Sequence, residues 1–274
     1  MSEFLEGYLI PALVFFFGGY FIIKTGGLFL KHPKKFAKAL SYKGDGDASA
    51  LRSLGVALAG PLGVGIIVGV VGAIGLGGAG AIFWMWISSF FAMMLKYAET
   101  VVAMKNRFFS HNGIHGGGMY YVSPKPLAVI FAILCLACSF VLGGAIQSEA
   151  LAHCAKTVLG IDGNAVCIIM AILCAVVICL GKRGIFTLAS RIVPFMSILY
   201  ALMCIAVIAL GRHKLPSVFH DIINGAFTPS AVAGGGVFAA IKSGILRGLI
   251  SNEAGCGSAP IAHAACDNPS PACQ

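Results

Sequence analysis

Seven long apolar runs, each close to the length that crosses a lipid bilayer, dominate this chain. A membrane-spanning helix needs about 20 apolar residues, and a soluble domain keeps about a quarter of its residues charged. Here 58% of the 274 residues are hydrophobic and 11% are charged. Polar side chains therefore cannot cover a globule, and lipid must be the solvent. The runs lie at about residues 9–23, 54–76, 80–104, 127–146, 165–180, 192–210 and from 237 onward.

The net charge of +9 indicates membrane topology rather than nucleic-acid binding. Short cytoplasmic loops carry an excess of Lys and Arg. Segments 31–53, 105–126 and 182–191 together hold twelve basic residues, whereas the segments on the other side hold three. We therefore expect a multi-pass protein of the plasma membrane with its N-terminus outside. Part of the basic linker 31–53 is expected on the membrane surface as an amphipathic helix.

Motifs for covalent chemistry are missing from the sequence. It has no P-loop, no G-x-S-x-G and no H-E-x-x-H, so an enzyme is not predicted. Most of the ten Cys lie in or beside apolar runs, where a thiol acts as a small hydrophobe. Cys135 and Cys138 are interpreted as core packing rather than as a metal or redox pair. No metal site is predicted.

Two of the apolar runs contain residues that interrupt a helix. The second run contains GPLGVG (residues 60–65), and the seventh contains SNEAGCGSAP (251–260). Non-helical backbone at membrane depth is tolerated only where it is buried or lines a cavity. For GPLGVG, close helix packing is an open alternative. An intramembrane carboxylate such as Glu253 costs roughly 2.5–3.5 kcal/mol, and it indicates a functional centre.

Several segments resemble the alanine/glycine:cation symporter family, also called the sodium:alanine symporters. RGLISNEAGCGSAPIAHAA (247–265) is similar to the most distinctive motif of that family. The likeness runs from about residue 15 to residue 270. It is supported by residues 77–99, 116–122, 193–210 and 215–235.

The resemblance implies cation-coupled symport of small neutral amino acids such as alanine or glycine, with Na⁺ as the coupling ion and H⁺ as an alternative. It also implies an all-α integral membrane protein with a leucine-transporter-like inverted-repeat fold, here truncated after about seven of eleven spans. The expected layout is an extra N-terminal helix (1–30), a cytoplasmic linker (31–53), a first five-helix repeat (54–210), an outer segment (211–235) and the start of a second repeat (236–274).

The resemblance also assigns expected roles to individual residues. Glu253 is expected as a buried carboxylate, with a structural or gating role. The backbone carbonyls of Ala59 and Leu62 are expected to bind a cation. The residues expected to bind substrate are Gly63, Gly65, Gln147, Ser251, Asn252, Gly255 and Ser258.

Three departures from the family pattern support an alternative, a degenerate or fragmentary relative that does not transport. Ile66 stands where the family has an Asn, and Pro61 and Val64 stand where hydroxyls are common. Glu149 stands where an Asn is typical. The third departure is the chain length, which leaves about four spans of the second repeat missing. A channel or a membrane-embedded sensor is a further alternative.

Two other pairs of ionisable residues each allow a structural and a functional interpretation. Lys96 and Glu99 are three apart on the third run, and we interpret them as a structural ion pair in preference to a proton relay. His111 and His115 have the spacing of zinc ligands, but their glycine-rich surroundings favour a solvated loop.

Overall fold

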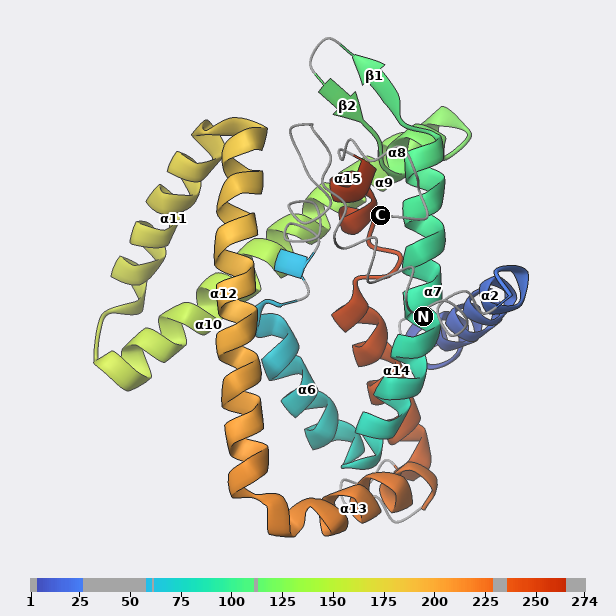
Figure 1. Ribbon diagram of the computed structural model, residues 1–274, viewed down its shortest axis with the longest axis vertical. Helices are drawn as coiled ribbons and strands as arrows, with labels where there is room; N and C mark the ends of the chain where they lie inside the picture. The colour runs from blue at the N-terminus through green and yellow to red at the C-terminus, as the bar shows by residue number, and fades with distance from the viewer. Residues whose placement is uncertain (1–3, 27–57, 61, 111–112, 229–235, 265–274) are drawn as a thin grey trace. The chain divides into compact units, whose positions relative to one another are not determined.

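The computed structural model describes residues 4–26, 58–60, 62–110, 113–228 and 236–264, and they are mostly helical (Figure 1). The predicted basic linker 31–53 lies outside these residues. The described helices are α2 (Ile10–Lys24), α6 (Val64–Gly77), α7 (Gly80–Lys105), α8 (Gly118–Tyr121), α9 (Lys125–Cys138), α10 (Ile146–Cys154), α11 (Gly163–Cys179), α12 (Gly181–Leu210), α13 (Leu215–Phe227), α14 (Gly236–Asn252) and α15 (Ser258–Ala264).

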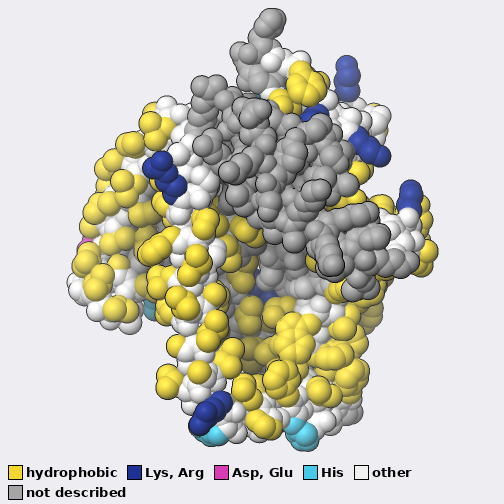
Figure 2. All heavy atoms as spheres, in the orientation of Figure 1, with side chains coloured by type: hydrophobic (Ala, Val, Ile, Leu, Met, Phe, Trp, Pro, Cys, Tyr) yellow, Lys and Arg dark blue, Asp and Glu magenta, His cyan; other side chains and the backbone are white. Residues whose placement is uncertain are grey.

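Several helices are long and apolar enough to cross a membrane, which agrees with the composition. Four described stretches qualify: Gly7–Lys24, Gly80–Lys105, Lys125–Leu159 and Thr187–Leu210. The apolar helices α6 and α11 are shorter. Figure 2 shows hydrophobic side chains over α11 and α12 on the face in view, and Ile168 and Leu202 on these helices are largely exposed. Apolar surface of this extent needs lipid around it, so the chain is a multi-pass membrane protein.

The ends of two predicted spans were wrong. The fourth span, predicted at 127–146, is part of a helical stretch that continues through two π-helical segments to Leu159. The sixth span, predicted from residue 192, is part of α12, which begins at Gly181, so the predicted loop 182–191 is helical. Pro194 consequently lies inside α12 and not in its first turn. Hydropathy marks only the apolar part of a helix, and it misses a charged end that continues the same helix.

The described residues fall into two compact units, each assembled from separate parts of the sequence. The first contains α2, residues 66–98 and residues 196–255, which include α13 and α14. In this unit α7 packs against α14 through small residues. A Cβ added at Gly244 would overlap the carbonyl oxygen of Ala81, and one at Gly248 would overlap the hydroxyl of Ser88. The later residue of α14, Gly248, contacts the later residue of α7, Ser88, so α7 and α14 are parallel.

α6 packs against a second face of α14. Gly77 lies against the hydroxyl of Ser243, and Gly69 lies against the guanidinium group of Arg247. These contacts run in opposite directions along the two helices, so residues 66–77 of α6 are antiparallel to α14. A side chain larger than hydrogen at Gly69 would displace the Arg247 head group.

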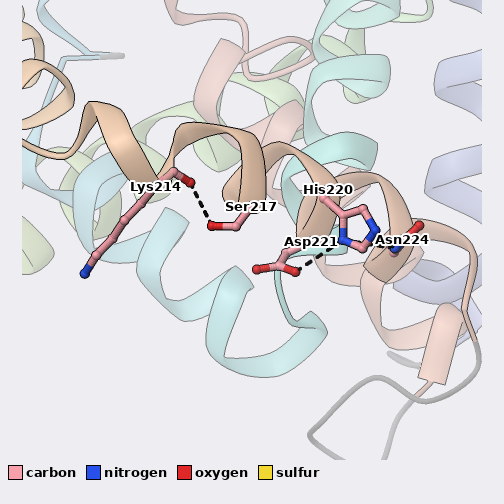
Figure 3. A network of polar contacts seen from close by, with 5 residues as sticks. All are labelled: Lys214, Ser217, His220, Asp221 and Asn224. Carbon is pink, nitrogen blue, oxygen red and sulfur yellow. Dashed lines mark hydrogen bonds and ion pairs between the residues drawn. The ribbon is translucent and has the colours of Figure 1, made fainter.

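α13 is an amphipathic helix that follows α12 after a single 3-10 turn, Arg212–Lys214. Its buried face, with Ile222 and Ala226, packs in the first unit, and the indole nitrogen of Trp84 donates to the carbonyl of Ala226 at 3.1 Å. The polar face carries His220 and Asn224, whose side chains are within 2.9 Å of each other (Figure 3). α13 therefore buries one face in the first unit, whereas Phe219 is exposed outside that face.

The second unit contains residues 58–60, 62–65, 99–110, 113–195 and 256–264 among those described. α11 packs against α10, where a Cβ added at Gly163 would lie 3.1 Å from the Cβ of Ala152. The segment predicted as a solvated loop is instead an antiparallel hairpin, β1 (Phe108–Ser110) and β2 (Gly113–His115). His115 stacks on Phe108 with ring centroids 5.3 Å apart, and His111 lies outside the described residues. The predicted repeat, 54–210, stays a prediction.

Candidate functional site

α14 stops inside the segment where the sequence predicts an interruption. It ends at Asn252, and the chain then makes turns until α15 begins at Ser258 (Figure 1). Glu253, Gly255 and Gly257 have φ of 49°, 85° and 77°, in the left-handed region that an α-helix cannot contain. The predicted break between residues 251 and 260 is therefore confirmed.

Gly257 is required at this break for two reasons. Its φ is positive, which costs an L-residue with a side chain roughly 1–2 kcal/mol. A Cβ at this position would also lie 2.6 Å from the ring of Phe131 and 3.0 Å from the sulfur of Cys135. Cys135, interpreted from sequence as core packing, donates its thiol to the carbonyl of Cys256 at 3.2 Å. The side chain thus satisfies a backbone group that the break exposes.

The end of α14 concentrates polar atoms. The hydroxyl oxygen of Ser251 is buried and has no hydrogen-bond partner among the described residues. The amide nitrogen of Asn252 donates to the carbonyl of Gly248 at 2.8 Å, which leaves its side-chain oxygen as an acceptor. A hydroxyl and an amide oxygen are suitable partners for an ammonium group or a hard cation. Glu253 was expected to be buried, but it is half-buried in the structure.

The start of α6 is the second interruption. Residues 58–59 are helical, Gly60 and Leu62 lie in turns, and α6 begins at Val64. The N–H of Gly63 donates to the carbonyl of Gly60 at 3.2 Å. The first N–H groups of α6 have no acceptor within the helix itself, so their partners come from the turn before it and from other segments.

Gln147 occupies that helix N-terminus. The N–H of Val64 donates to its side-chain oxygen at 2.9 Å, and its amide nitrogen lies so close to Gly63 that a Cβ there would overlap it. At Gly65 a Cβ would make ordinary contacts, 3.7 Å to Ile146 and 3.8 Å to Gln147. The family resemblance names Gly63, Gly65 and Gln147 as substrate-binding residues, and the structure places them next to one another. It also shows an arrangement that the sequence did not predict: the first amide of α6 is already bonded.

The remaining predicted positions lie at the edges of these two breaks. Ala59, predicted to bind a cation through its carbonyl, is exposed, and Leu62 is half-buried in the turn before α6. Gly255 is exposed in the turn after α14. Ser258 is exposed at the first residue of α15. Their roles stay predictions.

The sequence did not predict one contact at the α14 break. The ammonium group of Lys96, on α7, donates to the backbone carbonyl of Asn252 at 2.8 Å. The sequence marks Lys96 as an ionisable residue in a span, but it gives no sign of which helix faces it. Glu99 lies in the second unit, where burial and then its negative charge raise the pKa of Tyr121. The predicted ion pair between Lys96 and Glu99 stays a prediction.

The amino-acid sequence of the chain matches one known protein family. The model of the sodium:alanine symporter family matches residues 1–274. The chain belongs to the sodium:alanine symporter family.

Relatives from bacteria and archaea support the membership. An uncharacterized transporter of Haemophilus influenzae is 37% identical over 100% of this chain and 63% of its own length. The sodium/alanine symporter AgcS of Methanococcus maripaludis is 38% identical over 87% of this chain and 55% of its own length. The amino-acid carrier protein AlsT of Bacillus subtilis is 30% identical over 100% of this chain and 60% of its own length. These relatives are named as transporters and not as enzymes.

The chain spans somewhat more than half the length of these relatives. The matched region contains both of the interrupted helices described above. The resemblance deduced from the motif at 247–265 is therefore confirmed at the level of the family.

Proposed function

We propose that the protein couples the entry of Na⁺ to the uptake of a small neutral amino acid such as alanine or glycine across the plasma membrane. The observation that carries this proposal is the polar end of α14. A buried serine hydroxyl without a partner among the described residues costs free energy unless something bonds to it. A ligand ammonium group on Ser251 and on the side-chain oxygen of Asn252 would supply that bond.

The start of α6 is the proposed position of the ligand carboxylate. A helix N-terminus is the positive end of the helix dipole, and its first N–H groups point outward, both favourable for an anion. In the structure the side-chain oxygen of Gln147 bonds the N–H of Val64. We infer that the carboxylate competes with this amide oxygen, and that Gln147 turns its own N–H₂ group to the ligand. The proposed carboxylate partners are thus Gly63, Gly65 and Gln147, together with the N–H of Val64 that the Gln147 oxygen would release.

The proposed coupling ion is Na⁺, as in the name of the Methanococcus maripaludis relative, with H⁺ as the competing candidate. Backbone carbonyls at Ala59 and Leu62 are proposed as ion ligands, since hard cations prefer oxygen. The proposed orientation places the N-terminus outside, following the excess of basic residues in the segments assigned to the cytoplasm. Gly255, Ser258 and Glu253 are proposed to shape the break that holds the ligand.

Uptake into proteoliposomes tests the proposal. The protein, expressed from its own gene, is reconstituted, and radiolabelled alanine, glycine and glutamine are supplied under an inward Na⁺ gradient. We expect accumulation of alanine or glycine above its equilibrium level, which is lost when K⁺ replaces Na⁺ or when an ionophore removes the gradient. A proton gradient that drives uptake equally well without Na⁺ would assign the coupling to H⁺. Binding without accumulation would favour a relative that does not transport.

A further inference from the structure

The end of α14 presents carbonyl groups that the helix itself does not bond. The last carbonyls of any helix lack an N–H partner and form the negative end of its dipole. Here the carbonyl of Ile250 accepts from the N–H of Glu253 at 3.0 Å. The carbonyl of Asn252 accepts from the ammonium of Lys96 at 2.8 Å. The last carbonyl before the break therefore accepts a hydrogen bond from a side chain of another helix.

The packing of α7 on α14 directs Lys96 to that carbonyl. Ser88, Ala92 and Lys96 follow one another at intervals of four, so they share one face of α7. Ser88 and Ala92 are fully buried, and Ser88 lies against Gly248. Since α7 and α14 are parallel, the next turns along this face bring Lys96 to the level of Asn252. The tightly packed interface thus fixes the position of the Lys96 side chain, whereas a lysine on an open surface would be free to move.

We propose that Lys96 is a positioning residue that acts as a built-in cation at the interrupted helix. Its ammonium group caps α14 and occupies the backbone carbonyl of Asn252. A ligand cation or ammonium is then confined to the oxygens that remain, the hydroxyl of Ser251 and the side-chain oxygen of Asn252. The inference rests on the proposed function for the identity of that ligand, but the capping role does not depend on it.

The first test measures the cap without any ligand. Amide hydrogen exchange is followed in lipid nanodiscs for Lys96→Met, Lys96→Arg and the matched control Lys24→Met. Lys24 lies at the exposed end of α2 and donates to the hydroxyl of Tyr20 at 3.2 Å, so the control removes the same charge away from the break. We expect Lys96→Met to speed exchange in residues 250–257 by roughly tenfold, about 1.4 kcal/mol, with α11 unchanged. Lys96→Arg keeps a charged donor and should stay close to the wild type.

The second measurement separates the cap from the proposed transport. Alanine binding is titrated at several Na⁺ concentrations for the wild type and both Lys96 variants. Because Lys96→Met frees the carbonyl of Asn252 for a cation, the dependence of alanine affinity on Na⁺ should change, and Lys96→Arg should restore it. If Lys96→Met does not fold, Lys96→Gln keeps a neutral N–H donor and should show the same changes to a smaller extent.

The outcomes separate the two hypotheses. Unchanged exchange at residues 250–257 in Lys96→Met, or an increase that spreads evenly over all helices, overturns the inference. Faster exchange confined to the break, in a protein that binds no alanine, supports the cap and contradicts the proposed function.

Discussion

The contact between Gly63 and Gln147 gives the sharpest prediction for the start of α6. A Cβ at Gly63 would overlap the side-chain nitrogen of Gln147, whereas a Cβ at Gly65 would make only ordinary contacts, 3.7 Å or longer. Gly63→Ala must therefore push the Gln147 amide away and break its bond to the N–H of Val64, 2.9 Å in length. Gly65→Ala changes no such contact and is the matched control.

The expected magnitudes follow from that bond. A neutral hydrogen bond contributes about 0.5–1.5 kcal/mol net, and overpacking costs about 1–3 kcal/mol. Replacing glycine with alanine returns about 0.4–1 kcal/mol through the unfolded chain. We expect Gly63→Ala to lower the free energy of unfolding by about 1–2 kcal/mol. Gly65→Ala should leave that free energy unchanged or raise it by up to about 1 kcal/mol.

A double-mutant cycle tests the reasoning directly. The free energy of unfolding is measured by SDS titration in mixed micelles for Gly63→Ala, Gln147→Ala and the double variant. If Gln147 is the cause, Gly63→Ala should cost almost nothing in the Gln147→Ala background, with a coupling free energy of about 1 kcal/mol. Additive costs, or equal costs for Gly63→Ala and Gly65→Ala, would refute the argument.

Two further predictions concern the end of α14. Gly257→Ala should lower the free energy of unfolding by at least about 2 kcal/mol, because it adds backbone strain to an overlap with Phe131 and Cys135. The control is Gly72→Ala, where a Cβ meets nothing within 4 Å, and this variant should be as stable as the wild type or more stable. Equal thermal midpoints for the two variants would contradict the geometry. Ser251→Ala removes a buried hydroxyl without a partner among the described residues, so stability should hold or rise by about 1 kcal/mol while alanine affinity falls. Titration calorimetry measures that affinity, and a variant that binds alanine as the wild type does would exclude Ser251 as a ligand.

The interrupted helix at the end of the chain could be predicted because its residues carry the cause themselves. Gly255 and Gly257 permit positive φ, and both adopt it. Glu253 adopts it as well, although it is not a glycine. Local chemistry of this kind can be read from a sequence without knowing the partners. The start of α12 could not be read in the same way, since Lys182 and Arg183 lie within the helix but before its apolar part.

Contacts between distant residues are the part that the sequence could not supply. The bond from Lys96 to the carbonyl of Asn252 joins positions 156 residues apart, and the one from Val64 to Gln147 joins positions 83 apart. Both depend on which faces of two helices meet, and the apolar periodicity of a lipid-exposed helix does not encode that choice. Gln147 is named by family resemblance, and the structure adds that its side-chain oxygen accepts from the N–H of Val64, between Gly63 and Gly65.

We propose that residues at both interrupted helices take part in binding a small amino acid. Hydrogen exchange of the protein in nanodiscs, compared with and without saturating L-alanine in the presence of Na⁺, is the sharpest test of this proposal. We expect slower exchange in peptides covering residues 58–65 and 250–258, and no change in α11. Saturating alanine that leaves both regions unaltered, or that protects α11 in their place, would contradict it.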